Sequence, residues 1–202
     1  METSAAGPGL RERKKLETRL ALARAAMRLA VEQGIENVRV EDIASAVNVS
    51  PRTFNNYFSS KEEAIVSLGV ERDQRIADAL RDRPPAEPLG RALVEVFAEQ
   101  YGKGGFDGDP EMRDRIRLML SSPALRGVYL QRLAAGEQQL AEAIAARLGT
   151  DVTTDAYPRV LAAAVSGAVR AAVTHWVVSG SVGSIPELIR RSVAQIVEGV
   201  AQ

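Results

Sequence analysis

Residues 38–61 constrain the fold of this chain more than any other stretch. Apolar residues at helical spacing predict a short helix over residues 41–47, and Asn48 suits a left-handed turn because Asn tolerates positive φ. Ser50 and Pro51 then follow as an N-cap residue and a proline at the first helical position. The segment therefore predicts two short helices joined by a tight turn, which is the helix-turn-helix arrangement.

The second of these helices separates an apolar face from a polar one. At about 100° per residue, Phe54 and Phe58 lie within roughly 40° of each other, so they form the predicted buried face. The opposite face carries no acid and no large aliphatic side chain. Its guanidinium, carboxamide, hydroxyl and phenol groups suit base edges and phosphates in a DNA major groove. The residues that supply them are Arg52, Thr53, Asn55, Asn56 and Tyr57.

The start of the following helix predicts a contact with the DNA backbone. Ser60 and Glu63 have the spacing of a capping box. The amides exposed at that start, together with Lys61, form a candidate phosphate anchor. Basic residues crowd residues 11–28, and such a run just before a helix-turn-helix favours a phosphate-contacting arm over a merely solvated helix face.

Residues 18–63 resemble the DNA-binding domain of the TetR family of bacterial transcriptional regulators. The matching pieces are Thr18 and Arg19 at the start of a helix, Gly34 at its end, and residues 40–44 and 52–63. The resemblance implies that Thr18 and Arg19 contact the DNA backbone, that the protein is a homodimer, and that a small-molecule effector controls its binding to double-stranded DNA.

The chain departs from the family pattern at four positions. Arg39 replaces a usual hydroxyl cap, Asn48 stands where Gly is usual, and Asn55 and Asn56 stand where an aromatic residue and a His are common. The sequence preference of relatives therefore does not carry over to this chain.

The remaining sequence predicts long helices separated by proline and glycine. We expect a first helix from residue 10 or 16 to residue 33, and helices over residues 62–81, 89–101, 110–120, 123–148 and 185–200, in addition to the two short ones. We also expect Thr154 or Asp155 to cap a helix that runs to residue 178. The predicted fold is all-α with about nine helices: a helix-turn-helix domain over residues 1–61, and an effector-binding and dimerisation domain over residues 62–202.

The last two helices carry an assembly signal. Each has a stripe at helical spacing, and either stripe alone is typical of a protein core. The resemblance implies instead that the two helices pair with their symmetry mates as a four-helix interface. The predicted interface residues are Ala164, Gly167, Ala168, Ala171, Leu188, Ile189, Ser192, Val193 and Ile196.

The middle helices carry aromatic and methionine side chains that are candidates for an effector pocket. Core packing is the alternative for each of them. Polarisable side chains with few charges would suit a largely apolar effector. The candidate residues are Phe97, Tyr101, Phe106, Met112, Met119, Tyr129, His175 and Trp176, with Leu120, Gln100 and Arg117 as further candidates.

Two other classes of function compete with a regulator. An enzyme has little support, because the chain has no Cys and one His, and we find no metal-ligand cluster, nucleophile motif or phosphate-binding loop. We therefore expect no catalytic residue, metal or cofactor. A helical ligand-binding or interaction protein that has lost its DNA affinity remains the alternative.

Composition and hydropathy predict where the protein acts. Apolar residues make up 46% and charged residues 26% of the 202 residues, with a net charge of zero, as in ordinary globular proteins. No uninterrupted apolar run approaches the roughly 20 residues of a membrane-spanning helix. We therefore expect a cytoplasmic protein with no membrane partner.

Overall fold

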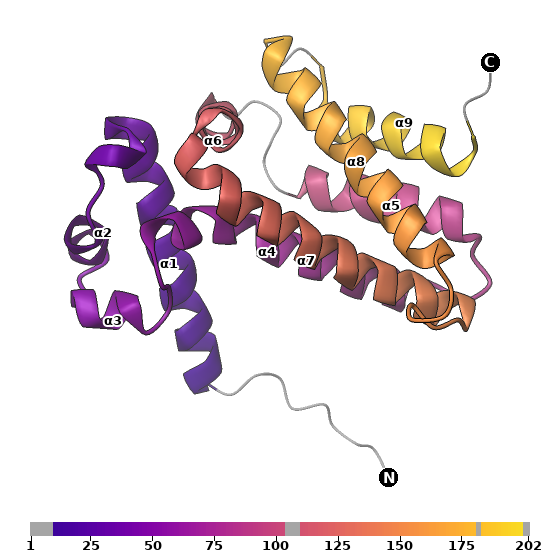
Figure 1. The fold of residues 1–202 in the computed structure, drawn as a ribbon, viewed down its shortest axis with the longest axis horizontal. Helices are drawn as coiled ribbons and strands as arrows, with labels where there is room; N and C mark the ends of the chain where they lie inside the picture. The colour runs from indigo at the N-terminus through magenta and orange to yellow at the C-terminus, as the bar shows by residue number, and fades with distance from the viewer. Residues whose placement is uncertain (1–9, 104–109, 181–182, 200–202) are drawn as a thin grey trace. The chain divides into compact units, whose positions relative to one another are not determined.

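The computed structural model describes residues 10–103, 110–180 and 183–199, and within these ranges it confirms the all-α class (Figure 1). The described elements are nine α-helices and one short 3-10 helix. The chain divides into two compact units, Met1–Leu68 (unit 1) and Gly69–Gln202 (unit 2). The division falls inside helix α4 (Lys61–Asp82), and the predicted domain boundary lies where that helix begins.

Unit 1 consists of α1 (Leu10–Gln33), the 3-10 helix η1 (Ile35–Asn37), α2 (Val40–Ala46), α3 (Pro51–Asn55) and the first turns of α4. Helix α1 ends where predicted, because Gly34 adopts a positive φ of 81° that favours glycine. The core of unit 1 is built from one apolar face of each helix. Its members include Leu22, Ala26, Ile43, Phe54, Phe58 and Ile65.

The turn between α2 and α3 forms as the sequence predicts. Asn48 has a φ of 56°, and the amide of Val49 donates to the carbonyl of Ala44 over 3.0 Å. Helix α2 begins one residue earlier than predicted. The Arg39 amide donates to Oδ2 of Asp42 over 3.3 Å, so an acid in the first turn caps a helix that lacks a hydroxyl N-cap.

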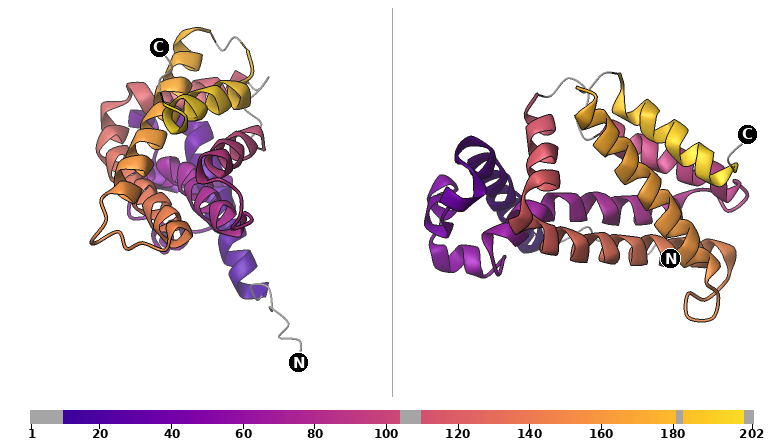
Figure 2. Two further views of the ribbon diagram at one scale, coloured as in Figure 1. Left: turned by 90° about the vertical axis from the view of Figure 1, so that its right-hand side faces the viewer. Right: turned by 45° about the horizontal axis from the view of Figure 1, so that its top comes forward.

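Unit 2 consists of the rest of α4 with α5 (Leu89–Gly102), α6 (Pro110–Ser121), α7 (Pro123–Leu148), α8 (Tyr157–Val178) and α9 (Ile185–Val197). Helix α8 packs against α7 on one side and α9 on the other, and α9 also packs along α5 (Figure 2). Helix α8 begins at Tyr157, and Asp155, one of the two predicted caps, stays outside it and accepts a hydrogen bond from the Tyr157 amide over 2.9 Å. The shared core includes Leu80, Leu93, Phe97, Ile144, Val165, Trp176 and Ile189.

The proline-rich connection between α4 and α5 is fixed by one side chain of α7. Arg147 donates to the carbonyls of Arg83, Pro84 and Glu87 over 3.0, 2.6 and 2.7 Å. Arg83 in turn forms a two-pronged ion pair with Glu87, with N–O distances of 2.7 and 2.6 Å. The break between the helices is therefore an ordered turn that is held to the end of α7.

Helix α8 is long and apolar enough to cross a membrane by length and composition alone, although Arg159 and Arg170 leave no uninterrupted apolar run of about 20 residues. It has 22 residues, and its most apolar window has a mean hydropathy of 1.4, with 33% of that window buried. The core helix of a water-soluble domain passes the same test. The low buried share means that a large part of α8 faces outward, and this matters for the interface described below.

Candidate nucleic-acid interface and effector cavity

Helix α3 is short, and two features of its sequence hold it in place. Ser50 caps it, since its Oγ accepts the Thr53 amide over 3.1 Å. Phe54 and Phe58 are 0% and 2% exposed, and their ring centroids lie 5.6 Å apart. The prediction that these two phenylalanines attach the helix to the rest of unit 1 is confirmed.

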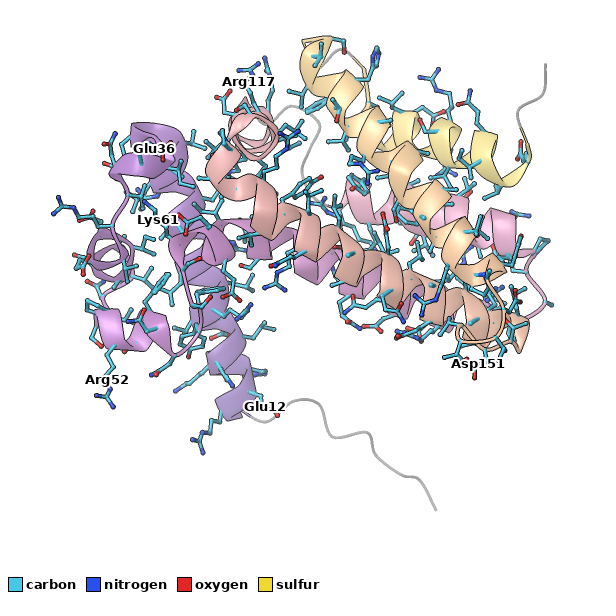
Figure 3. All side chains as sticks on the ribbon, viewed as in Figure 1. Glu12, Glu36, Arg52, Lys61, Arg117 and Asp151 are labelled. Atoms are coloured by element: carbon cyan, nitrogen blue, oxygen red, sulfur yellow. The ribbon has the colours of Figure 1, made fainter. Side chains whose placement is uncertain are left out.

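The opposite face of α3 is open. Arg52, Asn55 and Asn56 are exposed, and Thr53 and Tyr57 are half-buried at its margins. Arg52 points away from the body of unit 1 (Figure 3). The exposure of Arg52 and Asn56 confirms the predicted orientation of the helix, while their contact with DNA stays a prediction.

Two basic residues predicted to contact DNA are engaged inside unit 1. Nη1 of Arg19 donates to the carbonyl of Tyr57 over 2.8 Å, and its guanidinium lies 4.4 Å from the centroid of the Phe58 ring. Nζ of Lys61 donates to the carbonyls of Ile35 and Val38 over 2.7 and 2.8 Å. Arg19 therefore joins α1 to the segment after α3, and Lys61 joins α4 to the segment around η1.

The start of α4 is capped in a slightly different way from the prediction. Oγ of Ser60 accepts the Glu63 amide over 3.1 Å, as in a capping box. The Glu63 carboxylate reaches one residue further back and accepts both the amide and the hydroxyl of Ser59, over 2.8 and 2.7 Å. Thr18, the other predicted backbone contact, donates its hydroxyl to the carbonyl of Lys14 over 2.9 Å.

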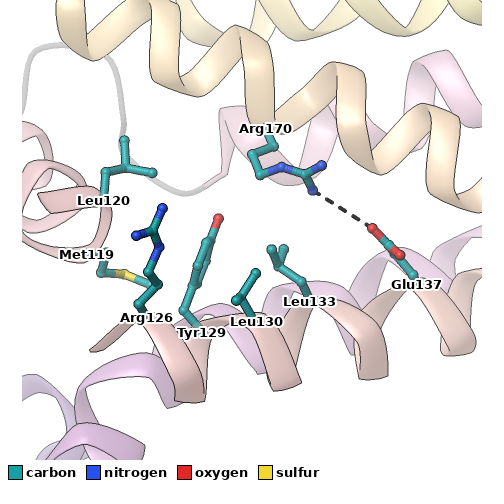
Figure 4. Close-up of a pocket in the computed structure, with 8 residues that line it drawn as sticks. All are labelled: Met119, Leu120, Arg126, Tyr129, Leu130, Leu133, Glu137 and Arg170. Carbon is teal, nitrogen blue, oxygen red and sulfur yellow. Dashed lines mark ion pairs between the residues drawn. The ribbon is translucent and has the colours of Figure 1, made fainter. Parts of the chain in front are cut away.

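Unit 2 contains a cavity of about 410 Å³ bounded by α6, α7 and α8 (Figure 4). Its size falls within the range of small-molecule sites. One wall is apolar, and charged side chains from α7 and α8 reach into it. The lining residues are Met119, Leu120, Arg126, Tyr129, Leu130, Leu133, Glu137 and Arg170.

The polar groups of the cavity are incompletely matched. Arg170 and Glu137 form an ion pair at one end of the lining, and its N–O distance of 3.8 Å is long for a charge-assisted hydrogen bond (Figure 4). Burial raises the pKa of Tyr129, and Tyr101 and Asp73 add to that rise while Arg170 and Arg72 oppose it. The Tyr129 phenol is therefore protonated at neutral pH and is a hydrogen-bond donor.

The structure distributes the predicted pocket residues among several places. Met119 and Tyr129 line the cavity, and so does Leu120. Phe97, Tyr101 and Trp176 belong to the core of unit 2, where the Trp176 indole donates to the carbonyl of Gly183 over 3.1 Å. His175 is exposed, as is Arg117, which bonds to Asp114, whereas Gln100 is buried. Phe106 and the side chain of Met112 lie outside the described residues.

Sequence reasoning missed the charged lining of the cavity, although α7 carried a signal for it. Arg126, Leu130, Leu133 and Glu137 recur at spacings of four, three and four, so they share one helical face. A leucine pair between opposite charges indicates an amphipathic lining. The position of Arg170 on α8 had no such signal.

A carboxylate lies beside this region, where α4 meets α7. Asp73 is half-buried, and a Cβ added to Gly136 of α7 would lie 2.8 Å from its Oδ2. The glycine therefore makes room for the carboxylate. Burial raises the pKa of Asp73 to about 6, although Arg72 acts in the opposite direction.

The predicted interface residues fall into two groups. Ile189 and Val193 are fully buried in the core of their own chain, so the prediction that they face a partner is corrected for this conformation. The others are half-buried or exposed, and they continue an outward face of α8 on which Val160 and Val178 are 63% and 80% exposed. This group comprises Ala164, Gly167, Ala168, Ala171, Leu188, Ser192 and Ile196.

Comparison with protein families gives two matches that together span most of the chain. Residues 22–66 match the model for bacterial regulatory proteins of the tetR family. Residues 86–201 match the model of the MftR C-terminal domain, a TetR-type C-terminal domain. The first match contains the helix-turn-helix, and the second contains most of unit 2.

Individual proteins show the same likeness. The chain is 38% identical to the HTH-type transcriptional regulator TcmR of Streptomyces glaucescens, over 84% of this chain and 77% of TcmR. The fatty acid degradation regulator FadR of Bacillus halodurans has a similar fold, with a TM-score of 0.61 at 20% identity, covering 96% of this chain and 98% of FadR. Thermus thermophilus FadR, a TetR-family repressor in complex with lauroyl-CoA, gives 0.57 at 20% identity, covering 91% and 95%.

Proposed function

Because the chain belongs to the TetR family of bacterial transcriptional regulators, which bind DNA, we propose that it represses transcription from a near-palindromic operator until a small effector releases it. The observation that carries this proposal is the polar face of α3. Arg52, Asn55 and Asn56 are exposed there while Phe54 and Phe58 are sealed beneath. A helix presented in this way fits the major groove.

Arg52 is the residue we assign to base reading. An arginine that contacts a guanine through two hydrogen bonds contributes roughly 1–3 kcal/mol of discrimination against other bases. Asn55, Asn56, Thr53 and Tyr57 add contacts to bases and phosphates. Arg19 and Lys61 are assigned first to positioning α3 and α4, because both side chains bond to carbonyls of unit 1.

The proposed dimer interface is the outward face of α8 with the adjoining edge of α9. Small residues along α8 permit close approach of a second helix, and the exposed valines at its ends provide apolar area. A Cβ at Gly167 would meet only Nη2 of Arg170, at 3.7 Å, so a longer side chain fits the monomer. Gly167→Gln should fold normally and still shift the protein toward monomers in analytical ultracentrifugation.

The cavity of unit 2 is the proposed effector site, and α4 is the proposed link to DNA binding. An effector lowers DNA affinity only by preferring a conformation whose two reading helices are wrongly spaced. Helix α4 begins in unit 1 and continues into unit 2, where Asp73 packs against α7 of the cavity wall. A shift of α7 on ligand binding would therefore reach α4 directly.

The deciding experiment is binding of the full chain to its own upstream DNA, followed by fluorescence anisotropy at several salt concentrations. Specific binding should weaken steeply with salt, because phosphate contacts release counterions. Arg52→Ala should relax the preference at one base pair of each half-site, and Arg81→Ala, an exposed change at the end of α4, should have no effect. Binding that does not distinguish operator from random DNA would contradict the proposal.

The same measurement tests the alternative of an interaction protein without DNA affinity. If the chain does not bind DNA even at low salt, this alternative is favoured. A regulator of this class acts in the cytoplasm and needs no catalytic group. Turnover of any substrate would contradict that part of the proposal.

A further inference from the structure

The cavity of unit 2 has an amphipathic lining that points to the chemical class of its ligand. Met119, Leu120, Leu130 and Leu133 form its apolar part, and Arg126, Tyr129 and Arg170 bring hydrogen-bond donors to it (Figure 4). We propose that the effector is an amphipathic carboxylic acid, whose carboxylate binds Arg170 while its apolar body lies on the leucines and Arg126 adds positive charge to the lining. This inference rests on the proposed effector site.

The charge of the lining is the first argument. Among the described lining residues there are two guanidinium groups and one carboxylate, so this part of the lining carries an excess positive charge. Among the described residues Arg126 has no ion-pair or hydrogen-bond partner. Arg126 is exposed and the Arg170 side chain is 41% exposed, so both are open to a ligand. An acid that covered them would form charge-assisted hydrogen bonds, whereas a neutral ligand that covered them would take charge out of water without compensation.

The state of Arg170 is the second argument. Its separation of 3.8 Å from Glu137 exceeds the 2.7–2.9 Å typical of a charge-assisted hydrogen bond. A ligand carboxylate can therefore form a shorter and better-oriented pair with Arg170 than Glu137 does. The Tyr129 hydroxyl, which is drawn within the same cavity, supplies a further donor (Figure 4).

The exposed leucines are the third argument. Leu130 is 57% exposed and Leu120 is 40% exposed, and both line the cavity, so its lining includes apolar surface that is open to water. An apolar chain or ring system laid over them would remove that surface from water. The cavity of about 410 Å³ suits a ligand of ordinary drug-like size.

The test compares acids with alcohols of the same shape. Binding of decanoate and decanol, and of 2-naphthoate and 2-naphthol, is measured on the full chain by isothermal titration calorimetry at pH 8. We expect at least one acid to bind about ten- to a hundredfold more tightly than its matched alcohol, since the carboxylate gains charge-assisted hydrogen bonds. Equal binding of acid and alcohol in both pairs, or no binding of either acid, overturns the inference.

Two substitutions should change acid binding in opposite directions. Arg170→Gln should weaken binding of the acid about tenfold or more and leave binding of the alcohol unchanged. Glu137→Gln should strengthen binding of the acid severalfold, because it removes the competing carboxylate. Arg117→Gln removes an exposed arginine of α6 outside the cavity and should change neither. Opposite changes cannot come from general loss of folding, and equal effects of the Arg170 and Arg117 changes would overturn the inference.

Calorimetry and DNA anisotropy together separate the two proposals. Acid binding with the expected variant pattern supports the ligand class even if operator binding is absent. If the alcohols release the protein from its operator as well as the acids do, and bind with equal affinity, the protein is an effector-controlled regulator but its effector need not be an acid. That result overturns the inference.

Discussion

Units 1 and 2 handle their inward-facing charges in different ways. In unit 1 the cations Arg19 and Lys61 donate to backbone carbonyls at 2.7–2.8 Å, so each has well-formed partners. In unit 2 Arg170 is loosely paired, and the carboxyl of Asp73 is held with a raised pKa. The difference indicates a rigid unit 1 that presents one helix and, in unit 2, an adaptable cavity wall where a ligand can improve existing contacts.

The largest expected effect tests the packing side of this comparison. Phe54→Ala removes a fully buried ring from unit 1 and should lower the free energy of unfolding by roughly 3–5 kcal/mol. Leu130→Ala removes a side chain that is 57% exposed and should cost less than about 1 kcal/mol. Far-UV circular dichroism during urea unfolding checks both changes. Similar losses would mean that unit 2 is packed as tightly around its cavity as unit 1 is around α3.

The location of the only tryptophan sharpens the first measurement. Trp176 lies in the core of unit 2, so its fluorescence reports that unit, whereas circular dichroism reports both. Phe54→Ala should therefore shift the dichroism transition while the tryptophan transition stays in place. A coincident shift of both signals would show that the two units unfold together.

The second prediction concerns Arg147, an arginine of unit 2 that is as well satisfied as those of unit 1. Arg147→Ala leaves three carbonyls of the connection between α4 and α5 without their donor. We expect a loss of roughly 2–3 kcal/mol by tryptophan fluorescence, since hydrogen bonds to charged groups are stronger than neutral ones. Arg147→Lys should recover part of this loss, because an ammonium can reach some of the carbonyls. No loss in either variant would show that the turn is stable without this arginine.

The third prediction uses the pH dependence of Asp73. Its pKa rises from 3.8 to about 6 on folding, so between these values the folded state binds more protons than the unfolded state. The free energy of unfolding should therefore fall as the pH rises from about 4 to 6, and above that range the ionised Asp73 carboxylate lowers it by a constant amount. Asp73→Asn should raise stability at pH 7 by roughly 2 kcal/mol and much less at pH 4. Asp82→Asn, at the exposed end of α4, serves as the control and should show no such difference.

The helices were predictable from sequence because their ends depend on local chemistry. Gly34, Asn48 and Gly149 adopt positive φ at the ends of helices, and Pro123 begins α7 as expected. The apolar and polar faces of α3 followed from spacing alone. These signals lie within a few residues of the structure they determine.

The cavity and the internal contacts of Arg19 and Lys61 could not be predicted, because they depend on how distant segments of the chain pack together. Arg170 reaches the cavity only because α8 packs against α7 with that face turned inward. Lys61 and Arg19 have long flexible side chains that suit either a phosphate or a carbonyl of their own chain. Ile189 and Val193 could face either a partner or α5, and the packing of α9 buried them within the chain.

The smallest expected effect on stability comes from comparing two cations of unit 1, Lys61, which bonds to its own chain, and Arg52, which is exposed. Lys61→Met keeps the length of the side chain but leaves the carbonyls of Ile35 and Val38 without its ammonium, so it should cost roughly 1–2 kcal/mol. Arg52→Gln changes an exposed side chain and should stay within about 0.5 kcal/mol, as surface substitutions usually do. In operator binding the order should reverse: Arg52→Gln alters base preference, whereas Lys61→Met lowers affinity for all sequences alike. If Lys61→Met left stability unchanged and flattened the salt dependence of DNA binding, the lysine would act on phosphate in the complex, and its assignment as an internal contact would be wrong.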